Sequence, residues 1–344
     1  MLKIFKENFK IYKEEVKDLD DILKSVKKND YKVNYIERVN LTGNNLHVIP
    51  DFSIFPNLQS LRITQNNIRR IEHLEQLEQL EVLSLIRNRI ERIEGLAGLA
   101  NLKELLLTFN QIPRIENLAP LENLEILDLS CNPIIKIEQL DDLARLRSLY
   151  LTNTGVRSIE GLDALHDLRS LYLNATKIAR IENLDSLENL GRLNISGSRI
   201  ETIENLQALH KIQDLDLARN RIRKIEHLNH MDAMSRLILD ENEIRVLENI
   251  EELDELEMLT LSGNKLTSIE AVEHNPDLEV LSLSKNRLKS LKGIENLVYL
   301  ETLDVEGNPL PPRVFKAVDE YNHMRVEPLE TRAAKLREIV RMTL

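Results

Sequence analysis

The sequence is poor in the residues that build disulfides, large aromatic cores and membrane spans. It has no tryptophan and a single cysteine, Cys131, in 344 residues, so an intramolecular disulfide is excluded. No apolar run approaches the roughly 18 residues that cross a bilayer. Charged residues interrupt residues 1–16 every few positions, which argues against a signal peptide. These absences predict a protein of the reducing cytoplasm with no membrane partner.

Motifs for catalysis and for cofactors are missing as well. The chain has no glycine-rich phosphate loop, no HExxH and no CxxC pair. His227 and His230 have a spacing that metal ligands can use, but they fall in a predicted turn with no nearby thiol. We therefore expect solvated histidines, no metal site, no cofactor and no enzymatic activity.

What the chain has instead is a repeat. A step of 22 residues stays in register without insertion through thirteen units, over residues 36–310. A clear copy is LEVLSLIRNRIERIEGLAGLAN, residues 80–101. The LxL alternation predicts a short strand with both leucines inward, and one such strand per unit predicts a parallel sheet. The apolar residues of the second half recur at three-residue steps, which is typical of 3₁₀ or short helical turns.

This pattern resembles the leucine-rich repeats of the short 22-residue class, and its IExL signature resembles the regulatory subunit of protein phosphatase 1 within that class. The resemblance covers residues 36–310. It implies an α/β fold, a right-handed curved solenoid with the parallel sheet on the concave face and the 3₁₀ turns on the convex face. It also implies two possible functions, as a regulatory subunit of a phosphatase or as a host-directed microbial effector.

Ten of the thirteen units carry Asn at their ninth position, and three consecutive units carry Thr154, Thr176 and Ser198 instead. In the resembled family, the buried Asn amide bonds the backbone of the turn. A hydroxyl has one proton to donate, so we expect Thr and Ser to make only part of these hydrogen bonds.

The residue between the two inward leucines faces the concave surface and is free to vary. Tyr150 and Tyr172 are the only aromatic residues at this position, on adjacent strands within stacking reach. Acidic residues flank them, and tyrosine is a common anchor of protein interfaces. We therefore predict a partner-binding surface between Leu106 and Asp240, formed by Leu106, Asp128, Tyr150, Tyr172, Asn194, Asp214, Asp216 and Asp240.

The net charge of the repeats indicates which class of partner to expect. The repeats contain 45 acidic and 30 basic residues out of totals of 57 and 46. Such a surface repels nucleic acid and anionic lipid, and it favours a protein partner with a basic surface. Rows of Glu and of Arg or Lys recur in the turns, and we expect exposed ion pairs of at most about 1 kcal/mol each.

The ends of a solenoid must be covered. Apolar residues at helical spacing from Leu2 to Val26 predict a helical cap over residues 1–35. Two further helices are predicted in residues 311–344, the second with Leu329, Ala333, Leu336 and Val340 on one face. We expect a monomer, a non-catalytic scaffold for protein–protein interaction. The alternative is structural self-assembly through the end helices.

Overall fold

The computed structural model describes residues 2–6, 9–13 and 36–344. The chain forms two compact units, Met1–Tyr172 and Leu173–Leu344. The boundary between them lies inside the repeat, directly after the second of the two tyrosines singled out above. Each unit is described by itself.

Every one of the thirteen predicted repeats contributes a strand of three residues. The first unit holds β3 (Arg38–Asn40), β4 (Ser60–Arg62), β5 (Val82–Ser84), β6 (Glu104–Leu106), β7 (Ile126–Asp128), β8 (Ser148–Tyr150) and β9 (Ser170–Tyr172). The second unit holds β10 (Arg192–Asn194), β11 (Asp214–Asp216), β12 (Arg236–Ile238), β13 (Met258–Thr260), β14 (Val280–Ser282) and β15 (Thr302–Asp304).

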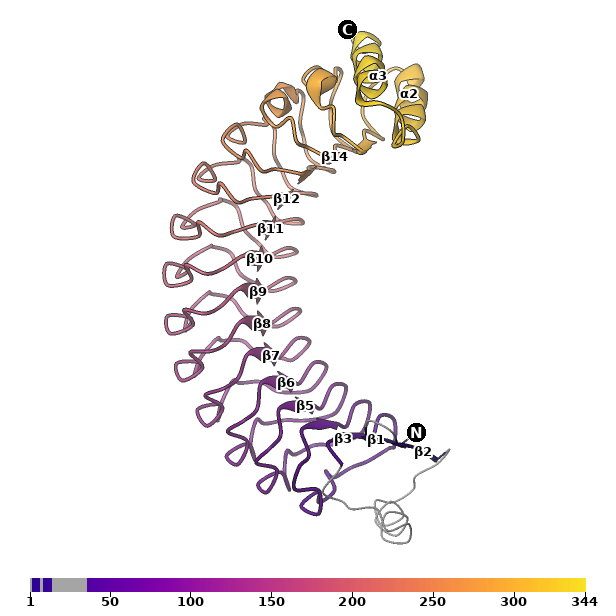
Figure 1. Ribbon diagram of the computed structural model, residues 1–344. Helices are drawn as coiled ribbons and strands as arrows, with labels where there is room; N and C mark the ends of the chain where they lie inside the picture. Colours follow the sequence, from indigo (N-terminus) through magenta and orange to yellow (C-terminus); the bar gives the residue numbers. More distant parts are fainter. Residues whose placement is uncertain (1, 7–8, 14–35) are drawn as a thin grey trace. The chain divides into compact units, whose positions relative to one another are not determined.

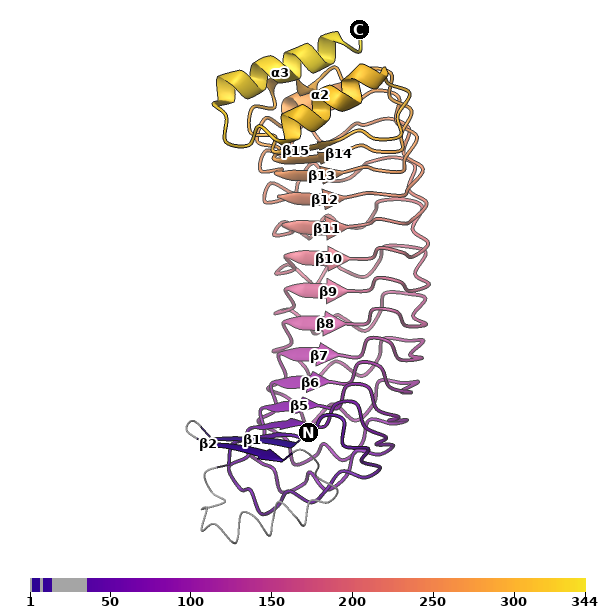
Figure 2. The same cartoon turned by 90° about the vertical axis from the view of Figure 1, so that its right-hand side faces the viewer.

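Within each unit, neighbouring strands are parallel and every residue faces the residue 22 positions further along the chain, as in Asp128 opposite Tyr150. The predicted parallel sheet is therefore confirmed. In each unit the strands line the inner side of the stack, and the turns on the opposite side spread wider (Figure 1). Within each unit, Figure 2 shows the strands of the repeats edge to edge and pointing the same way.

Leucine and isoleucine fill the space between strands and turns. The central residue of each strand is buried, as is Leu149 with no exposed surface. The turns close with backbone hydrogen bonds between residues three apart, such as Leu77 N–H to the Leu74 carbonyl at 3.0 Å. This is the 3₁₀ pattern that the three-residue spacing predicts. Two turns extend to 3₁₀ helices, η2 (Glu270–His274) and η3 (Ile294–Asn296).

The Asn at the ninth position of the repeat binds backbone groups of its own repeat and of the preceding repeat. Asn110 Nδ2 donates to the carbonyls of Leu107 at 2.9 Å and Leu85 at 3.0 Å, and its Oδ1 accepts the Ile90 N–H at 3.0 Å. Each such amide satisfies buried backbone groups of two consecutive turns. The role that the family resemblance implies for this Asn is therefore confirmed.

The hydroxyls that replace Asn make fewer of these bonds, as expected. Thr154 and Thr176 each donate one hydrogen bond of 2.8 Å, to the carbonyls of Leu151 and Leu173. Ser198 Oγ lies 3.0 Å from Thr176 Oγ1. Ile134 precedes Thr154 by 20 residues, as Ile90 precedes Asn110. Among the described residues, the Ile134 N–H donates to no side chain, whereas the Ile90 N–H donates to Asn110 Oδ1.

The N-terminal segment differs from its prediction. Leu2–Lys6 and Phe9–Lys13 are strands, β1 and β2, which pair with each other in antiparallel fashion. β1 also pairs with β3, so the predicted helix is wrong for these residues. Their sequences, LKIFK and FKIYK, are rich in β-forming residues, and the open edge of β3 supplies backbone groups that only a strand can pair. The rest of the predicted cap lies outside the described residues.

The C-terminal end is covered by two helices, α2 (Pro312–Asn322) and α3 (Leu329–Arg341), as predicted. They lie across the end of the second unit next to β15 (Figure 2). Ala333, Leu336 and Val340 are buried, but Leu329 is 42% exposed, because it lies in the first turn of α3. The side chains of Tyr321 and Arg332 both donate hydrogen bonds to the Leu300 carbonyl.

Candidate partner-binding surfaces

The two tyrosines form a stacked pair on the strand face of the first unit. Tyr150 of β8 and Tyr172 of β9 lie opposite each other in the register. Their ring centroids are 4.7 Å apart and the ring planes differ by 6°. Adjacent strands are about 4.8 Å apart, so the rings stand nearly perpendicular to the sheet and cover each other's inner faces. The predicted stacking is confirmed.

The neighbours of this pair on the same face are short or only half-buried. Ser148 and Ser170 precede the tyrosines by two residues and point to the same side of the sheet. Asp128 of β7 is half-buried and lies beside Tyr150, and Leu106 of β6 comes next. Four predicted residues are thus adjacent in the order Leu106, Asp128, Tyr150 and Tyr172.

Asp128 keeps acceptor capacity in this environment. Its Oδ1 accepts the Ser130 N–H at 2.9 Å. In the part of the chain that the structure describes, no Lys, Arg or His forms an ion pair with Asp128. A carboxylate has about four lone-pair sites, so most of its hydrogen-bonding capacity is available to solvent or to a partner.

An aromatic side chain at the rim of this face was missed in the sequence. Phe109 follows β6 by three residues, has φ +58° and is 48% exposed. All thirteen repeats have the left-handed conformation at this position, and the other repeats place Gly, Asn, a small residue (Cys131, Ala175) or a long polar residue there. The Arg87 guanidinium lies 5.1 Å from the Phe109 ring centroid, a cation–π contact. A bulky residue at a position that favours glycine was the signal available in the sequence.

The second unit carries the remaining predicted residues, and they form a polar network. Asn194 Nδ2 donates to Asp216 Oδ2 at 2.8 Å, and Asp216 Oδ1 accepts the Ala218 N–H at 3.0 Å. Asp214 lies 3.6 Å from the Arg236 guanidinium on β12. Asp216 is therefore held by neutral donors, whereas Asp214 is partly neutralised by a cation.

Asp240 is the most perturbed acid of this network. Burial raises the pKa of its carboxyl above the ordinary value of 3.8, and the negative charges of Asp216 and Glu241 raise the pKa further. Two hydrogen bonds oppose this shift, from Thr260 Oγ1 at 2.8 Å and from the Ser262 N–H at 2.7 Å. Neither Thr260 nor Ser262 was singled out in the sequence, because each is an ordinary polar residue of its strand or turn.

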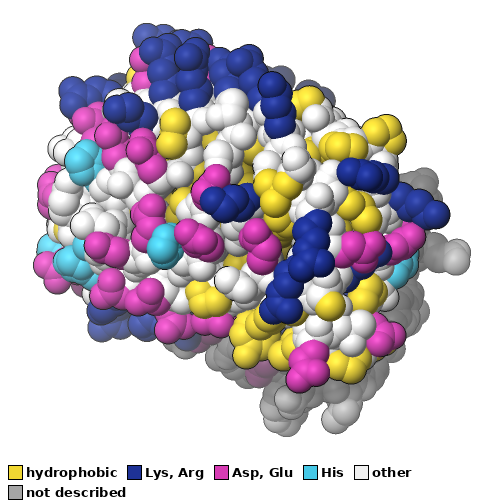
Figure 3. All heavy atoms as spheres, turned by 90° about the horizontal axis from the view of Figure 1, so that it is seen from above, with side chains coloured by type: hydrophobic (Ala, Val, Ile, Leu, Met, Phe, Trp, Pro, Cys, Tyr) yellow, Lys and Arg dark blue, Asp and Glu magenta, His cyan; other side chains and the backbone are white. Residues whose placement is uncertain are grey.

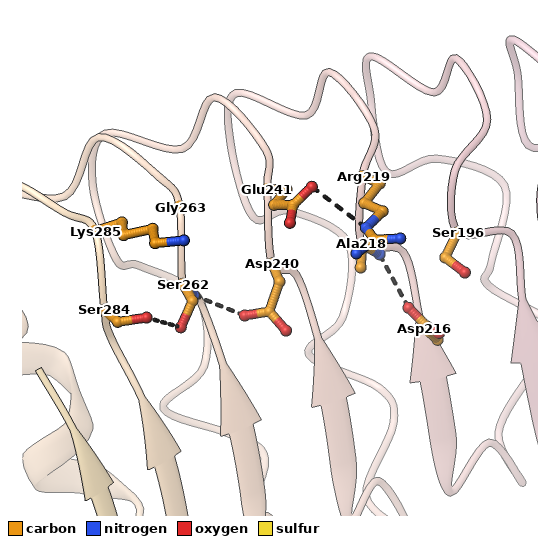
Figure 4. A pocket seen from close by; sticks show the side chains of 10 residues that line it. All are labelled: Ser196, Asp216, Ala218, Arg219, Asp240, Glu241, Ser262, Gly263, Ser284 and Lys285. Atoms are coloured by element: carbon orange, nitrogen blue, oxygen red, sulfur yellow. Dashed lines mark hydrogen bonds and ion pairs between the residues drawn. The ribbon is translucent and has the colours of Figure 1, made fainter. Parts of the chain in front are cut away.

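A hollow of about 390 Å³ opens at the ends of these strands. Figure 4 shows the carboxylates of Asp216 and Asp240 pointing into it from successive strand ends. Arg219 and Glu241 form an ion pair of 3.3 Å at its rim, and Ser284 donates to Ser262 at 3.0 Å. The complete lining is Ser196, Asp216, Ala218, Arg219, Asp240, Glu241, Ser262, Gly263, Ser284 and Lys285.

The predicted residues are distributed over both units. Leu106, Asp128, Tyr150 and Tyr172 lie together on the first unit, and Asn194, Asp214, Asp216 and Asp240 lie together on the second. We call the first group, with Phe109, the aromatic surface, and the second group, with the hollow, the acidic surface. The first offers ring area and hydroxyls, and the second offers carboxylates.

The charged rows of the turns pair as expected. A base of one unit reaches the Glu of the next, as in Arg70–Glu94 at 2.9 Å and Arg92–Glu116 at 3.1 Å. On the end face that carries the C-terminal helices, Figure 3 likewise shows Lys and Arg side chains together with Asp and Glu side chains. These pairs are exposed, so they stabilise little.

The described residues offer neither a metal-binding cluster nor a membrane-spanning helix. No three His, Cys, Asp or Glu side chains there form a group that could hold a metal ion. None of the helices in the described ranges is both long enough and apolar enough to cross a membrane.

Comparison with known proteins agrees with this fold. A leucine-rich repeat family model matches residues 34–90 and 56–112, and a model for two copies of the repeat matches residues 144–189. No curated protein matches the chain.

Solved structures show the same architecture. An internalin of Listeria monocytogenes is 25% identical, with 78% of each chain covered and a TM-score of 0.70. A leucine-rich repeat protein of Leptospira interrogans is 20% identical, covers 93% of this chain and 99% of its own, and has a TM-score of 0.66. A chain of the Toll–Spätzle complex of Drosophila is 18% identical over 80% of this chain and 42% of its own, with a TM-score of 0.71.

Proposed function

We propose that the chain, whose repeats match leucine-rich repeat models over residues 34–112 and 144–189, binds a protein partner through the aromatic surface of its first unit. The fold is typical of scaffolds for protein–protein interaction. The observation that carries the proposal is the stacked pair of Tyr150 and Tyr172, with ring centroids 4.7 Å apart on a face of short polar neighbours.

Two tyrosines held in this way suit an interface. Stacking fixes both ring orientations before binding, so the two tyrosines lose little side-chain entropy when a partner contacts them. The ring edges supply apolar area and the hydroxyls supply hydrogen bonds, which is why Tyr is enriched among residues that dominate binding energy. Phe109 extends the apolar area at the rim, because nearly half of its side chain is exposed.

Charge favours a partner with a basic surface. The acid excess of the repeats steers positively charged proteins toward the molecule and slows the approach of anionic ones. On the second unit, Asp216 and Asp240 offer carboxylates at the hollow, which we propose as a separate contact for such a partner.

The other functions have less support. The matched models describe leucine-rich repeats in general, so a phosphatase or a host protein as partner stays a prediction. Self-assembly through the C-terminal helices would need a free apolar face. Val314 of α2 and Leu336 of α3 are already buried against the second unit.

The test compares capture of proteins from the source lysate by three forms of the full chain. These are the wild type, the double variant Tyr150→Ala with Tyr172→Ala, and the control Tyr299→Ala, which removes a 48% exposed tyrosine elsewhere. We expect one protein to be retained by the wild type and the control and lost by the double variant, and to bind again when purified. Identical captures by all three forms, at equal thermal stability, contradict the proposal.

A further inference from the structure

We propose that the aromatic surface recognises an arginine side chain of the partner, inserted beside Tyr150 and above Asp128. This inference rests on the proposed function and names the chemistry of its partner. The receiving position, which we call the Asp128 notch, is bounded by Tyr150 on β8, Leu106 on β6 and Ile126 on β7, with Asp128 as its floor.

The notch follows from the order of side chains along the sheet. Leu106, Asp128 and Tyr150 occupy the same position on three consecutive strands, so Leu106 and Tyr150 are about 10 Å apart at the backbone. The aspartate between them is much shorter than the tyrosine. The ring of Tyr150 therefore rises above it, and the ring face that Tyr172 does not cover is turned toward the space over Asp128.

The floor of the notch is a carboxylate with spare acceptors. One oxygen of Asp128 accepts the Ser130 N–H at 2.9 Å, and no cation of the described ranges pairs with this residue. The carboxylate is half-buried, so an ion pair formed here is less screened by solvent than the exposed pairs of the turns.

The walls suit a guanidinium better than an ammonium. A guanidinium is planar and can stack on the ring face of Tyr150 while its N–H groups bind the Asp128 carboxylate. Its aliphatic stem would pack on Leu106 and Ile126, which are both half-buried. A lysine ammonium is more strongly hydrated and has no flat face, so it gains less from the ring.

The same surface already contains one contact of this kind. The Arg87 guanidinium lies 5.1 Å from the centroid of the Phe109 ring, at the rim beside β6. A guanidinium on an aromatic ring is thus compatible with the geometry of these repeats. At the notch the ring and the carboxylate are present, and the guanidinium has to come from the partner.

The experiment measures two fluorescein-labelled peptides, alternating Gly-Arg and alternating Gly-Lys of equal length, on the full chain at low salt by fluorescence anisotropy. In the wild type we expect the arginine peptide to bind about threefold more tightly than the lysine peptide. The variants Asp128→Asn and Tyr150→Leu should each abolish this preference. Both keep their local packing, since Asn can still accept the Ser130 N–H and Leu still covers the strand.

The matched controls are Asp304→Asn, at the same strand position on β15, and Tyr299→Leu, an exposed tyrosine. Both should keep the arginine preference, and Tyr150→Phe should keep it because the ring remains. Equal binding of the two peptides to the wild type, no binding of either peptide at about 1 mM, or a preference that survives Asp128→Asn overturns the inference.

These outcomes are separate from those of the proposed function. A partner captured by the wild type and lost by the double tyrosine variant, without any arginine preference, refutes the notch and keeps the proposed function. If the double tyrosine variant captures the same partner as the wild type, the proposed function itself is refuted.

Discussion

Single side chains at the ninth position of the repeat determine how well consecutive turns are joined. Asn110 makes three hydrogen bonds that link its unit to the preceding one. Thr154 makes one, within its own unit. The difference arises because an amide has two donors and an acceptor in a fixed plane, whereas a hydroxyl has a single proton.

Restoring the amide should therefore stabilise the first unit. We expect Thr154→Asn to raise the free energy of unfolding by about 1 kcal/mol, since its Nδ2 would reach the Leu129 carbonyl and its Oδ1 the Ile134 N–H. Urea unfolding measures the change. The reciprocal variant Asn110→Thr should lose a similar amount, and a Thr154→Asn protein no more stable than the wild type would show that the turn has already adapted to the hydroxyl.

The free energy of unfolding should depend on pH through Asp240, and the Asp240→Asn substitution should remove this contribution. Its pKa is raised above 3.8 in the folded protein, mainly by burial. The folded state therefore binds this proton more tightly than the unfolded chain does. The resulting stabilisation is present below pH 3.8 and is lost as the pH rises through the raised pKa.

Urea unfolding of the wild type and of Asp240→Asn across this pH range tests the effect. We expect the wild type to lose stability relative to the variant as the pH rises, and the difference to stay constant at higher pH. Asp304→Asn, at the end of β15 in the same unit, serves as the control. Parallel stability curves for the wild type and Asp240→Asn would show that the folded and unfolded proteins bind this proton equally.

At the level of elements, the repeat ends where α2 and α3 replace the next turn. A helix pair can cover the last turns because its apolar face matches the exposed end of the solenoid. It also supplies donors to the carbonyl of Leu300 in the last repeat. Tyr321 and Arg332 both donate to this oxygen, one from each helix.

The two donors should act as substitutes for each other. Tyr321→Phe and Arg332→Met each leave one hydrogen bond to Leu300, so we expect each to cost about 1 kcal/mol or less. The double variant leaves a buried carbonyl unpaired and should cost about 2 kcal/mol more than the sum. Urea unfolding of the four proteins gives the coupling, and additive costs would mean that water reaches the carbonyl.

At the scale of the whole molecule, the acid excess of the individual repeats adds up to a large net negative charge. The repeats carry 45 acids against 30 bases, and the whole chain has a net charge of −11. The ion pairs between turns are exposed, so they offset little of the repulsion between like charges.

We therefore expect sodium chloride to stabilise the protein. Raising the salt from about 0.05 M to about 0.5 M shortens the Debye length from roughly 14 Å to roughly 4 Å, and the repulsion of the acid excess should weaken more than the close ion pairs do. The urea midpoint should rise, and choline chloride at equal ionic strength should act alike. A lower midpoint in salt would show that the ion pairs contribute more than the repulsion costs.

The sequence by itself determined the repeat architecture, because thirteen copies of one pattern leave a single way to bury every leucine. It also predicted the stacking of Tyr150 and Tyr172 and the partial role of Thr154, since register follows from the 22-residue step and hydrogen-bonding capacity follows from side-chain chemistry.

Only the tertiary structure decided the rest, for a physical reason that recurs at each place. The strands at Leu2–Lys6 and Phe9–Lys13 and the shared donors on the Leu300 carbonyl depend on segments outside the repeat. The periodicity of the repeat carries no information about such contacts. The free energy of an unpaired sheet edge or of a buried carbonyl selects them once the chain is folded.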